Sequence, residues 1–315
     1  MTRSNASLGH VDFGIAVVDK PEGMTSNAVL SRVRKIVSNK RAGHTGTLDP
    51  FATGVLVIGV GRATRLFPLL QAKRKRYSAI LHLGSATDTA DLTGNVVESC
   101  PIMTFSSQDL DRIAADLIGR QYQIPPAYSA KKIAGVPSHV LARQNRAVDL
   151  APVEIEIFSL VLGAAESPGT VCVDVECSRG TYIRTLGEKI ALELGTVGHL
   201  VSLRRTLSDG FEIQNAVALE RFDSGSFIEL ERILADFAVA RISDSAFEHA
   251  RHGHPIPLGD VSYLRPSEAV GRDQGGLVAV FRDRPALGSL AVADFVGMYV
   301  VSETATLVAR MLFVS

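Results

Sequence analysis

Cysteine is scarce in this chain of 315 residues, which contains only Cys100, Cys172 and Cys177. Three scattered cysteines are too few for a disulfide framework, and the odd spacing of the last two predicts opposite faces of one strand. No apolar run reaches the roughly 18 residues of a membrane-spanning helix, and residues 1–10 lack the apolar core of a signal peptide. These absences predict a cytoplasmic protein whose thiols are neither paired nor metal-bound.

The eight histidines lack the spacing of metal ligands. His249, His252 and His254 cluster without the carboxylates or thiols that would complete a zinc site. His44 and Asp49 have no neighbouring serine or cysteine that could act as a hydrolase nucleophile. The sequence therefore predicts neither a metal centre nor a catalytic triad.

Acidic residues are rare in one long segment. From Lys20 to Arg76 the chain has twelve Lys and Arg residues against two acids, Glu22 and Asp49. The formal net charge of the whole chain is nevertheless zero, because residues 207–315 carry fifteen acids against nine Lys and Arg. The basic segment indicates a polyanionic partner. Because nearby positive charge favours a carboxylate anion, we also expect Asp49 to be ionised.

The length indicates two domains, since single domains usually span roughly 100–200 residues. We expect a disordered tail at 1–10, a larger domain over 1–240 and a small β-rich domain over 241–315. Apolar periodicity in the larger domain predicts helices within 25–37, 106–119 and 179–195, and strands over 13–21, 55–61, 77–84, 153–163, 170–178 and 199–207.

This order of elements predicts an α+β fold with a mixed, largely antiparallel sheet flanked by helices. A hairpin is expected to begin at 88–98, and Ser106 with Asp109 forms a capping-box pattern at a helix start. The small domain is predicted from a helix over 243–253 and from strands over 277–283, 287–295 and 306–314.

The most distinctive segment is RAGHTGTLDPFATG at 41–54, which contains three glycines and a single acid, Asp49. Glycine permits backbone conformations that other residues avoid, and the following Pro50 disfavours a helical Asp49. The apolar run at 55–61 predicts a buried strand directly after this loop. An isolated Asp-Pro is most simply a turn, but a lone acid on such a loop in a basic field indicates a binding or catalytic carboxylate.

A second segment, SRGTYIRTL at 178–186, brings an aromatic ring and a guanidinium close together. In an extended backbone Tyr182 and Arg184 would face one side. Alone, they would be a core tyrosine and a surface arginine. Beside Asp49, Arg184 could hold the carboxylate through two hydrogen bonds while Tyr182 offers a ring face.

Together these segments resemble the TruB family of tRNA pseudouridine-55 synthases. The resemblance extends from about residue 14 to about residue 207. Beyond residue 240 the chain resembles the PUA-like C-terminal domain of that family only in length and strand content. The segments that carry the resemblance are GHTGTLDPFATG at 43–54, KRY at 75–77, YSA at 128–130, RGTYIRTL at 179–186 and LRR at 203–205.

The resemblance implies an isomerase with the pseudouridine synthase fold, which converts a T-loop uridine of tRNA to pseudouridine without a metal or a cofactor. It implies that Asp49 is the nucleophile, attacking the ribose or the uracil of a flipped-out nucleotide. Arg184 would keep Asp49 ionised and aimed, and Tyr77 would stack on the uracil near the proton to be removed. The other implied contacts are Tyr182 against the base, Leu203 as a pocket wall, His44 in the place of the extruded base, and Lys20 and Pro21 as supports of the catalytic loop.

The implied partner is the T-arm of tRNA, with no membrane, no obligate protein partner and a monomeric enzyme. Two alternatives stay open: a non-catalytic RNA-binding or tRNA-folding protein, and a dinucleotide-dependent enzyme built on GVGRAT at 59–64. That segment lacks the third glycine of a dinucleotide fingerprint. Phe51 also replaces the usual leucine of the family. The residues expected to contact RNA phosphates are Arg41, Arg62, Arg65, Lys75, Arg76, Lys131, Arg143 and Arg204.

Overall fold

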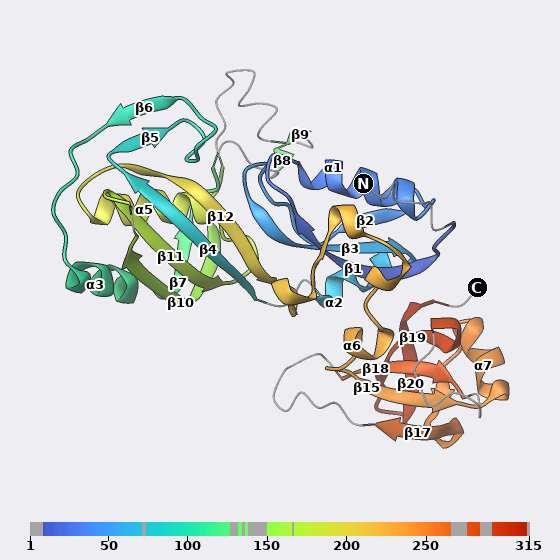
Figure 1. Ribbon diagram of the computed structural model, residues 1–315. Coiled ribbons are helices and arrows are strands. Elements are labelled where there is room, and N and C mark those ends of the chain that lie inside the picture. Colours follow the sequence, from blue (N-terminus) through green and yellow to red (C-terminus); the bar gives the residue numbers. More distant parts are fainter. Residues whose placement is uncertain are drawn as a thin grey trace. The chain divides into compact units, whose positions relative to one another are not determined.

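The computed structural model describes residues 9–70, 74–126, 132–133, 136–137, 150–165, 167–265, 276–283 and 292–313 (Figure 1). The described residues form two compact units, drawn from Met1–Val11 with Ile15–Ser226, and from Asp12–Gly14 with Phe227–Ser315. The expected domains, 1–240 and 241–315, stay a prediction, since compactness does not show which segments fold independently. Among the described residues, no helix has the length and apolarity needed to cross a membrane.

The first unit is built on a ten-stranded sheet with the main order β14-β1-β3-β12-β4-β11-β10-β7. β12 runs parallel to β3 and antiparallel to β4, and β11, β10 and β7 follow in antiparallel order. The predicted mixed, largely antiparallel sheet is therefore confirmed. Its strands are β1 (Phe13–Lys20), β2 (Ala42–His44), β3 (Thr53–Gly61), β4 (Lys75–Leu83), β7 (Gly119–Gln123), β10 (Val153–Ala164), β11 (Thr170–Cys177), β12 (Gly198–Ser208), β13 (Phe211–Glu212) and β14 (Val217–Ala218).

Helices α3 (Ser107–Leu117) and α5 (Ile183–Glu193) pack their apolar residues into one buried cluster with β4, β10, β11 and β12 (Figure 1). Because side chains alternate across a strand, one face of each strand supplies this cluster. The same cluster includes Tyr77 of β4, Leu203 of β12 and Phe51 of the Asp49 loop. The core beneath the helices therefore continues without interruption to the predicted site.

The predicted helix starts are confirmed. Helix α1 (Ser26–Ile36) begins after Thr25, whose side chain accepts a hydrogen bond from the helix backbone. Helix α3 begins with the expected capping box between Ser106 and Asp109. Its end differs from the prediction, because the backbone is already extended at the residue before Gly119. That glycine, with a φ of 111°, starts β7 instead of closing the helix.

The remaining elements of the first unit are short. β5 (Ser85–Thr87) and β6 (Val96–Ser99) form the predicted antiparallel hairpin. A second small hairpin joins β8 (Lys132–Ile133) to β9 (Val136–Pro137). The short helices are α2 (Phe67–Leu70), η1 (Arg62–Leu66), η2 (Ile213–Asn215), η3 (Leu219–Arg221) and η4 (Ser224–Ser226).

The second unit contains a six-stranded sheet with the order β16-β20-β19-β18-β15-β17, so its predicted β-rich character is confirmed. The expected strand over 287–295 is wrong in its described part, because residues 292–294 form a 3-10 turn and the buried apolar run follows them. The elements are β15 (Ala238–Ile242), β16 (Ile256–Pro257), β17 (Val261–Arg265), β18 (Leu277–Arg282), β19 (Phe295–Val301), β20 (Thr306–Leu312), α6 (Leu230–Ile233), α7 (Asp244–Arg251), η5 (Leu258–Asp260) and η6 (Val292–Asp294).

Candidate active site

Asp49 lies in the loop between β2 and β3. The amide of Ala52 donates a hydrogen bond of 3.1 Å to the carbonyl of Asp49, which closes a turn at this point. Leu48 and Phe51 are buried on either side of the acid and attach the loop to the core. The Asp49 side chain itself is 32% exposed and borders a cleft.

Ser26 holds this loop from beneath. Its hydroxyl oxygen accepts a hydrogen bond from the amide of Leu48 at 2.8 Å, and the hydroxyl donates to the carbonyl of Leu48 at 3.1 Å. Thr25 and Ser26 both carry a hydroxyl that could cap the start of α1. The structure gives the cap to Thr25 and leaves Ser26 to fix the residue before Asp49.

Lys20 also lies under the loop, where its side chain is fully buried. Burial lowers the pKa of Lys20 to about 8, and the Asp49 carboxylate opposes that fall. The ammonium donates to three backbone carbonyls within 3.1 Å, those of Pro21, Met24 and Pro50. Lys20 therefore ties the end of β1 to the turn that carries Asp49.

Arg205 of β12 supports the two ends of the loop. This guanidinium is fully buried and donates from Nε to the carbonyl of Val55 at 2.7 Å. Its two Nη atoms donate to the carbonyls of Gly46 at 3.0 Å and Thr47 at 3.4 Å. In the parallel pairing of β12 with β3, its backbone lies beside Gly54.

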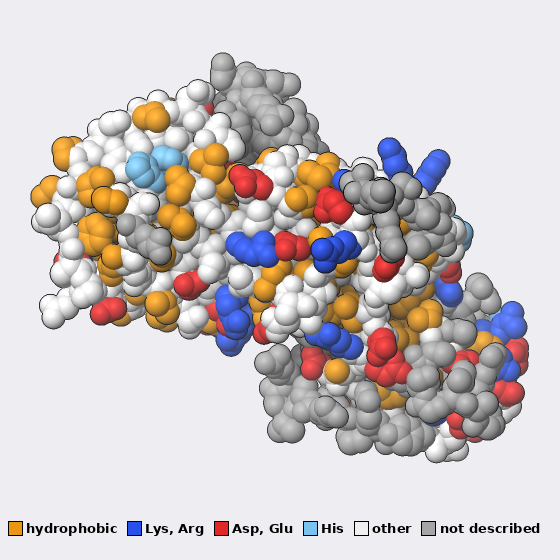
Figure 2. Space-filling view, viewed as in Figure 1, with side chains coloured by type: hydrophobic (Ala, Val, Ile, Leu, Met, Phe, Trp, Pro, Cys, Tyr) orange, Lys and Arg blue, Asp and Glu red, His pale blue; other side chains and the backbone are white. Residues whose placement is uncertain are grey.

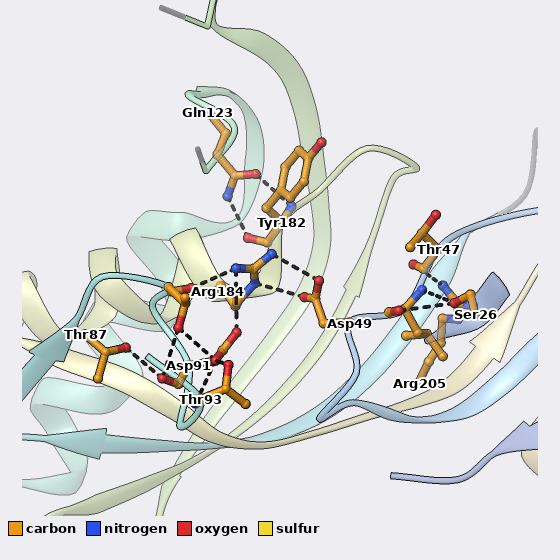
Figure 3. Close-up of polar contacts among 12 residues, drawn as sticks. Ser26, Thr47, Asp49, Thr87, Asp91, Thr93, Gln123, Tyr182, Arg184 and Arg205 are labelled. Atoms are coloured by element: carbon orange, nitrogen blue, oxygen red, sulfur yellow. Dashed lines mark hydrogen bonds and ion pairs between the residues drawn. The ribbon is translucent and has the colours of Figure 1, made fainter. Parts of the chain in front are cut away.

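The Asp49 carboxylate is held by a two-point contact with Arg184 (Figure 3). Arg184 Nε lies 2.9 Å from Asp49 Oδ2, and Arg184 Nη2 donates to Oδ1 at 3.1 Å. The Arg184 side chain is only 4% exposed, so solvent screens this pair weakly. The predicted bidentate contact is present, and it fixes the carboxylate in both position and orientation.

A second acid, Asp91, lies on the other side of the guanidinium. Arg184 Nη1 is 3.6 Å from Asp91 Oδ2 and donates to the carbonyl of Thr89 at 2.7 Å. Asp91 is buried, and its Oδ1 accepts hydrogen bonds from the backbone amide and hydroxyl of Thr93 (Figure 3). Arg184 is thus shared between two carboxylates, of which only Asp49 reaches the cleft.

Burial raises the pKa of the Asp49 carboxyl above its ordinary value of 3.8. The charge and hydrogen bonds of Arg184 and the charge of Lys20 act in the opposite direction, while the charge of Asp91 adds to the rise. The basic residues expected to favour ionisation are therefore present, but the effect of burial is larger.

Tyr182 is fixed at the N-terminus of α5 by the side-chain amide of Gln123 (Figure 3). The amide of Tyr182 donates to Gln123 Oε1 at 2.8 Å, and Gln123 Nε2 donates to the carbonyl of Tyr182 at 3.0 Å. The expected extended spacing of Tyr182 and Arg184 is wrong, because the helix already begins at Ile183. Both side chains nevertheless line the cleft.

The cleft has a volume of about 430 Å³, enough for a nucleobase with its ribose. Three predicted site residues, Asp49, Tyr77 and Arg184, therefore meet at one place from β4, α5 and the β2–β3 loop. Burial raises the pKa of Tyr77, so its hydroxyl is neutral at neutral pH. The lining residues are Thr45, Gly46, Thr47, Leu48, Asp49, Lys75, Tyr77, Arg179, Gly180, Thr181, Tyr182, Ile183, Arg184 and Leu203.

His44 lies at the end of β2, next to the lining residue Thr45. Burial lowers the pKa of His44, and the cations Arg205, Lys75 and Arg34 lower it further. The imidazole is therefore neutral at neutral pH. Its Nδ1 is buried and has no hydrogen-bond partner among the described residues.

The basic residues expected to contact RNA lie in different environments. Arg41 and Arg65 are exposed, Arg62 is half-buried and Lys75 lines the cleft. Lys131 and Arg143, like the YSA motif, lie outside the described residues.

Several of these cations lie against acids. Figure 2 shows one face on which Lys and Arg side chains lie beside Asp and Glu side chains. Arg76 is 3.1 Å from Glu176, which also contacts Arg74, and Arg204 forms a two-point pair with Asp19. The basic field inferred from the sequence is therefore partly neutralised.

Gly59 of the GVGRAT segment has a packing explanation. A Cβ on Gly59 would lie 2.6 Å from the ring of Phe67, and the same ring closely approaches Gly43 of the neighbouring strand β2. Glycine is required there because the aromatic ring occupies the space of a side chain. Within the described ranges, no three His, Cys, Asp or Glu side chains gather in a manner that could hold a metal ion.

Four residues that position this site were not singled out from the sequence: Ser26, Asp91, Gln123 and Arg205. The sequence indicates a role for Asp91 only weakly, through its position in the turn-rich segment DTADLTGN. Arg205 belongs to the LRR segment at 203–205, but that segment does not indicate its contacts with the Asp49 loop. Gln123 carried no local signal, because its partner Tyr182 is 59 residues away.

The fold is similar to that of a chain in the crystal structure of a Cbf5-Nop10-Gar1 complex. The TM-score is 0.65 at 23% identity, and the match covers 97% of this chain and 85% of that chain. This likeness confirms the expected mixed sheet with helices followed by a small C-terminal β domain.

The profile of the TruB family pseudouridylate synthase N-terminal domain matches residues 34–183. The protein named tRNA pseudouridine synthase B of Geotalea uraniireducens is 48% identical over 207 residues, which are 66% of either chain. The protein of the same name from Mycolicibacterium paratuberculosis is 39% identical over 279 residues, covering 87% of this chain and 94% of the relative. The chain belongs to the TruB family of pseudouridylate synthases, and it is an isomerase.

Proposed function

We propose that the protein isomerises uridine 55 in the T-loop of tRNA to pseudouridine, with Asp49 as the nucleophile. The observation that carries this proposal is the Asp49 carboxylate, which makes a bidentate contact with Arg184 and faces a cleft of about 430 Å³. The relatives named tRNA pseudouridine synthase B support tRNA as the substrate. The enzyme then works on cytoplasmic tRNA, as a monomer without an obligate protein partner.

The reaction needs one nucleophile and a retained leaving group. The bond from ribose C1′ to uracil N1 breaks and a bond from C1′ to C5 forms. The proton lost from C5 is balanced by one gained at N1, so the composition of the RNA is unchanged. The ionised Asp49 attacks the ribose or the uracil, and Arg184 aims it through the two-point contact.

The walls of the cleft supply contacts for a flipped uracil. Tyr77 and Tyr182 both line it, and stacking on an aromatic ring contributes roughly 1–3 kcal/mol per base. This offsets the cost of unstacking the nucleotide, which is of similar size. Leu203 closes the cleft with an apolar surface, and Tyr77 lies near the C5 proton.

His44 fills the place that the flipped base leaves in the T-loop. Its imidazole is neutral at neutral pH, because burial and three cations lower its pKa. A neutral ring can stack between bases. Lys20 and Pro21 take no part in this contact and instead support the Asp49 loop.

The test uses a tRNA transcript tritiated at uridine C5, without added metal or nucleotide. Pseudouridine formation releases the tritium into water. We expect release by the wild type, mapped to the T-loop, and none by Asp49→Ala. Release by Asp49→Ala would refute the assignment of the nucleophile. RNA binding without release by the wild type would indicate a non-catalytic RNA-binding protein instead.

A further inference from the structure

Lys75, one of the residues expected from the sequence to contact an RNA phosphate, has a side chain that the proposed chemistry does not use. It lies on β4 two residues before Tyr77, so both side chains face the cleft, about 7 Å apart along the strand. Lys75 is only 9% exposed. A Cβ added to Gly46 would lie 2.5 Å from Lys75 Nζ, so the ammonium sits directly against the backbone of the Asp49 loop.

This mostly buried side chain makes no hydrogen bond and no ion pair with any described residue, and its ammonium is open to the cleft. The charged side chains nearest to it include Arg205 and Arg179, which repel it, and Asp209, which is too far away to form an ion pair. A mostly buried cation without a protein partner is costly, so a site of this kind commonly accepts an anion.

Arg179 is a second cation at the same end of the cleft. It lies two residues after Cys177, whose backbone pairs with that of Lys75 in the β11–β4 ladder. Its side chain is exposed and makes no hydrogen bond or ion pair with a described residue. Two cations converge here, one buried and one solvated. A neutral uracil carbonyl would require neither, whereas a phosphate accepts hydrogen bonds from both.

We propose that Lys75 and Arg179 bind one backbone phosphate of the RNA beside the flipped nucleotide. The phosphate then lies about 7 Å from the ring of Tyr77, the spacing of alternate side chains along a strand. This inference rests on the proposed function, because it assumes an RNA nucleotide in the cleft. The contact would fix the depth to which the nucleotide enters, and thus the distance from its ribose to Asp49.

Phosphate binding at this position couples to protonation. Burial lowers the pKa of Lys75 to about 8, with Arg205 and Arg179 lowering it and Asp209 raising it; His44 is neutral and the Cys177 thiol has a pKa of about 11. A bound phosphate raises the pKa of Lys75. The contribution of Lys75 to RNA affinity is therefore fully present below pH 8 and is lost as the pH rises above 8.

The experiment measures binding of synthetic T-arm stem-loops, each with one neutral methylphosphonate linkage flanking the target uridine. We expect one linkage to weaken wild-type binding about tenfold and to have little effect on Lys75→Met, which already lacks the contact. Lys189→Met is the matched control, since Lys189 contacts Gln121 outside the cleft. Equal losses in the wild type and Lys75→Met at both linkages would overturn the proposal.

Two further variants keep the test decisive if Lys75→Met fails to fold. Arg179→Gln changes an exposed side chain, and Gly46→Ala displaces the Lys75 ammonium without removing its charge. In each variant the same methylphosphonate linkage should weaken RNA binding less than it does in the wild type. A loss of affinity as large as that of the wild type in both variants would contradict the proposal.

The pH dependence separates Lys75 from Lys20, whose pKa is also about 8. We expect Lys75→Met to abolish the weakening of RNA binding above pH 8. If the weakening persists, it arises elsewhere and the phosphate site is wrong. Because these measurements record binding, they remain informative even if the tritium assay contradicts the proposed isomerisation.

Discussion

At the scale of single residues, the site depends on polar groups that fix backbone atoms of the Asp49 loop. Lys20, Ser26 and Arg205 are buried, and each bonds to backbone groups of the loop or of its ends. A loop held in this way keeps the Asp49 carboxylate in place before the substrate arrives. Such preorganisation reduces the cost of reaching the transition state.

Ser26→Ala should lower both stability and activity. The substitution leaves the buried amide and carbonyl of Leu48 without their side-chain partner, at a cost of about 1–3 kcal/mol. We expect a matching loss in urea unfolding and about a tenfold fall in the single-turnover rate of tritium release.

The matched control is Thr25→Ala, which removes the neighbouring hydroxyl. Thr25 caps α1 and makes no hydrogen bond to the described residues of the loop, so stability should fall by about 1 kcal/mol while the rate is unchanged. Equal rate losses in Ser26→Ala and Thr25→Ala would show that Ser26 acts only through the helix.

The pH dependence of the rate should reflect the buried position of Asp49. Burial raises its pKa above 3.8, so the carboxylate that we propose as the nucleophile is lost as the pH falls through that raised value. We expect the single-turnover rate to begin its acid decline above the range of an ordinary aspartate. Circular dichroism at each pH would verify folding, and a rate that stays constant down to the ordinary range would contradict the assignment.

At the scale of elements, the site forms where β3, β4 and β12 lie side by side in the sheet. β12 pairs with both neighbours and so places Leu203 and Arg205 between the Asp49 loop and Tyr77. Gly54 allows this pairing, because its φ is 103° and a Cβ there would lie 2.2 Å from the carbonyl oxygen of Arg205.

Gly54→Ala should therefore destabilise the protein by at least about 2 kcal/mol, through a strained φ and a backbone collision. The displacement of Arg205 should also lower the rate of tritium release. The control is Gly163→Ala in β10, where a Cβ meets nothing within 4 Å. Thermal unfolding of both variants gives the comparison, and similar melting temperatures would refute this explanation of Gly54.

At the scale of the whole molecule, charge is distributed unevenly along the chain. The acids of residues 207–315 balance the basic first part in the sum. Within the first unit, acids also neutralise particular cations, since Glu176 contacts Arg74 and Arg76. The number of cations available to RNA is therefore smaller than the composition indicates.

Glu176→Gln should strengthen tRNA binding by releasing Arg74 and Arg76 from their carboxylate partner. We expect affinity to rise about threefold at low salt, with the slope of log Kd against log salt steeper by roughly one phosphate contact. Asp116→Asn, which breaks the exposed pair with Arg112 on α3, is the control and should change neither value. Unchanged binding by Glu176→Gln would show that this edge does not contact RNA.

Local patterns in the sequence determined much of this protein. The apolar periodicity of α1, the capping box of α3 and the alternation in β10 and β11 depend on neighbours a few residues apart, and these predictions are confirmed. The Asp49 loop was also visible, because glycine, proline and a lone acid in a basic segment are local features. The family resemblance rested on the same short segments.

Only the tertiary structure decided which distant groups complete the site. Arg184 and Asp49 are 135 residues apart, and Gln123 and Tyr182 are 59 apart, so no periodicity links them. Three features arise from strand order in the sheet: the sharing of Arg184 with Asp91, the burial that raises the pKa of Asp49, and the lack of a partner for Lys75 among the described residues. Local sequence sets the conformation of each segment, whereas desolvation and long-range pairing depend on which segments meet.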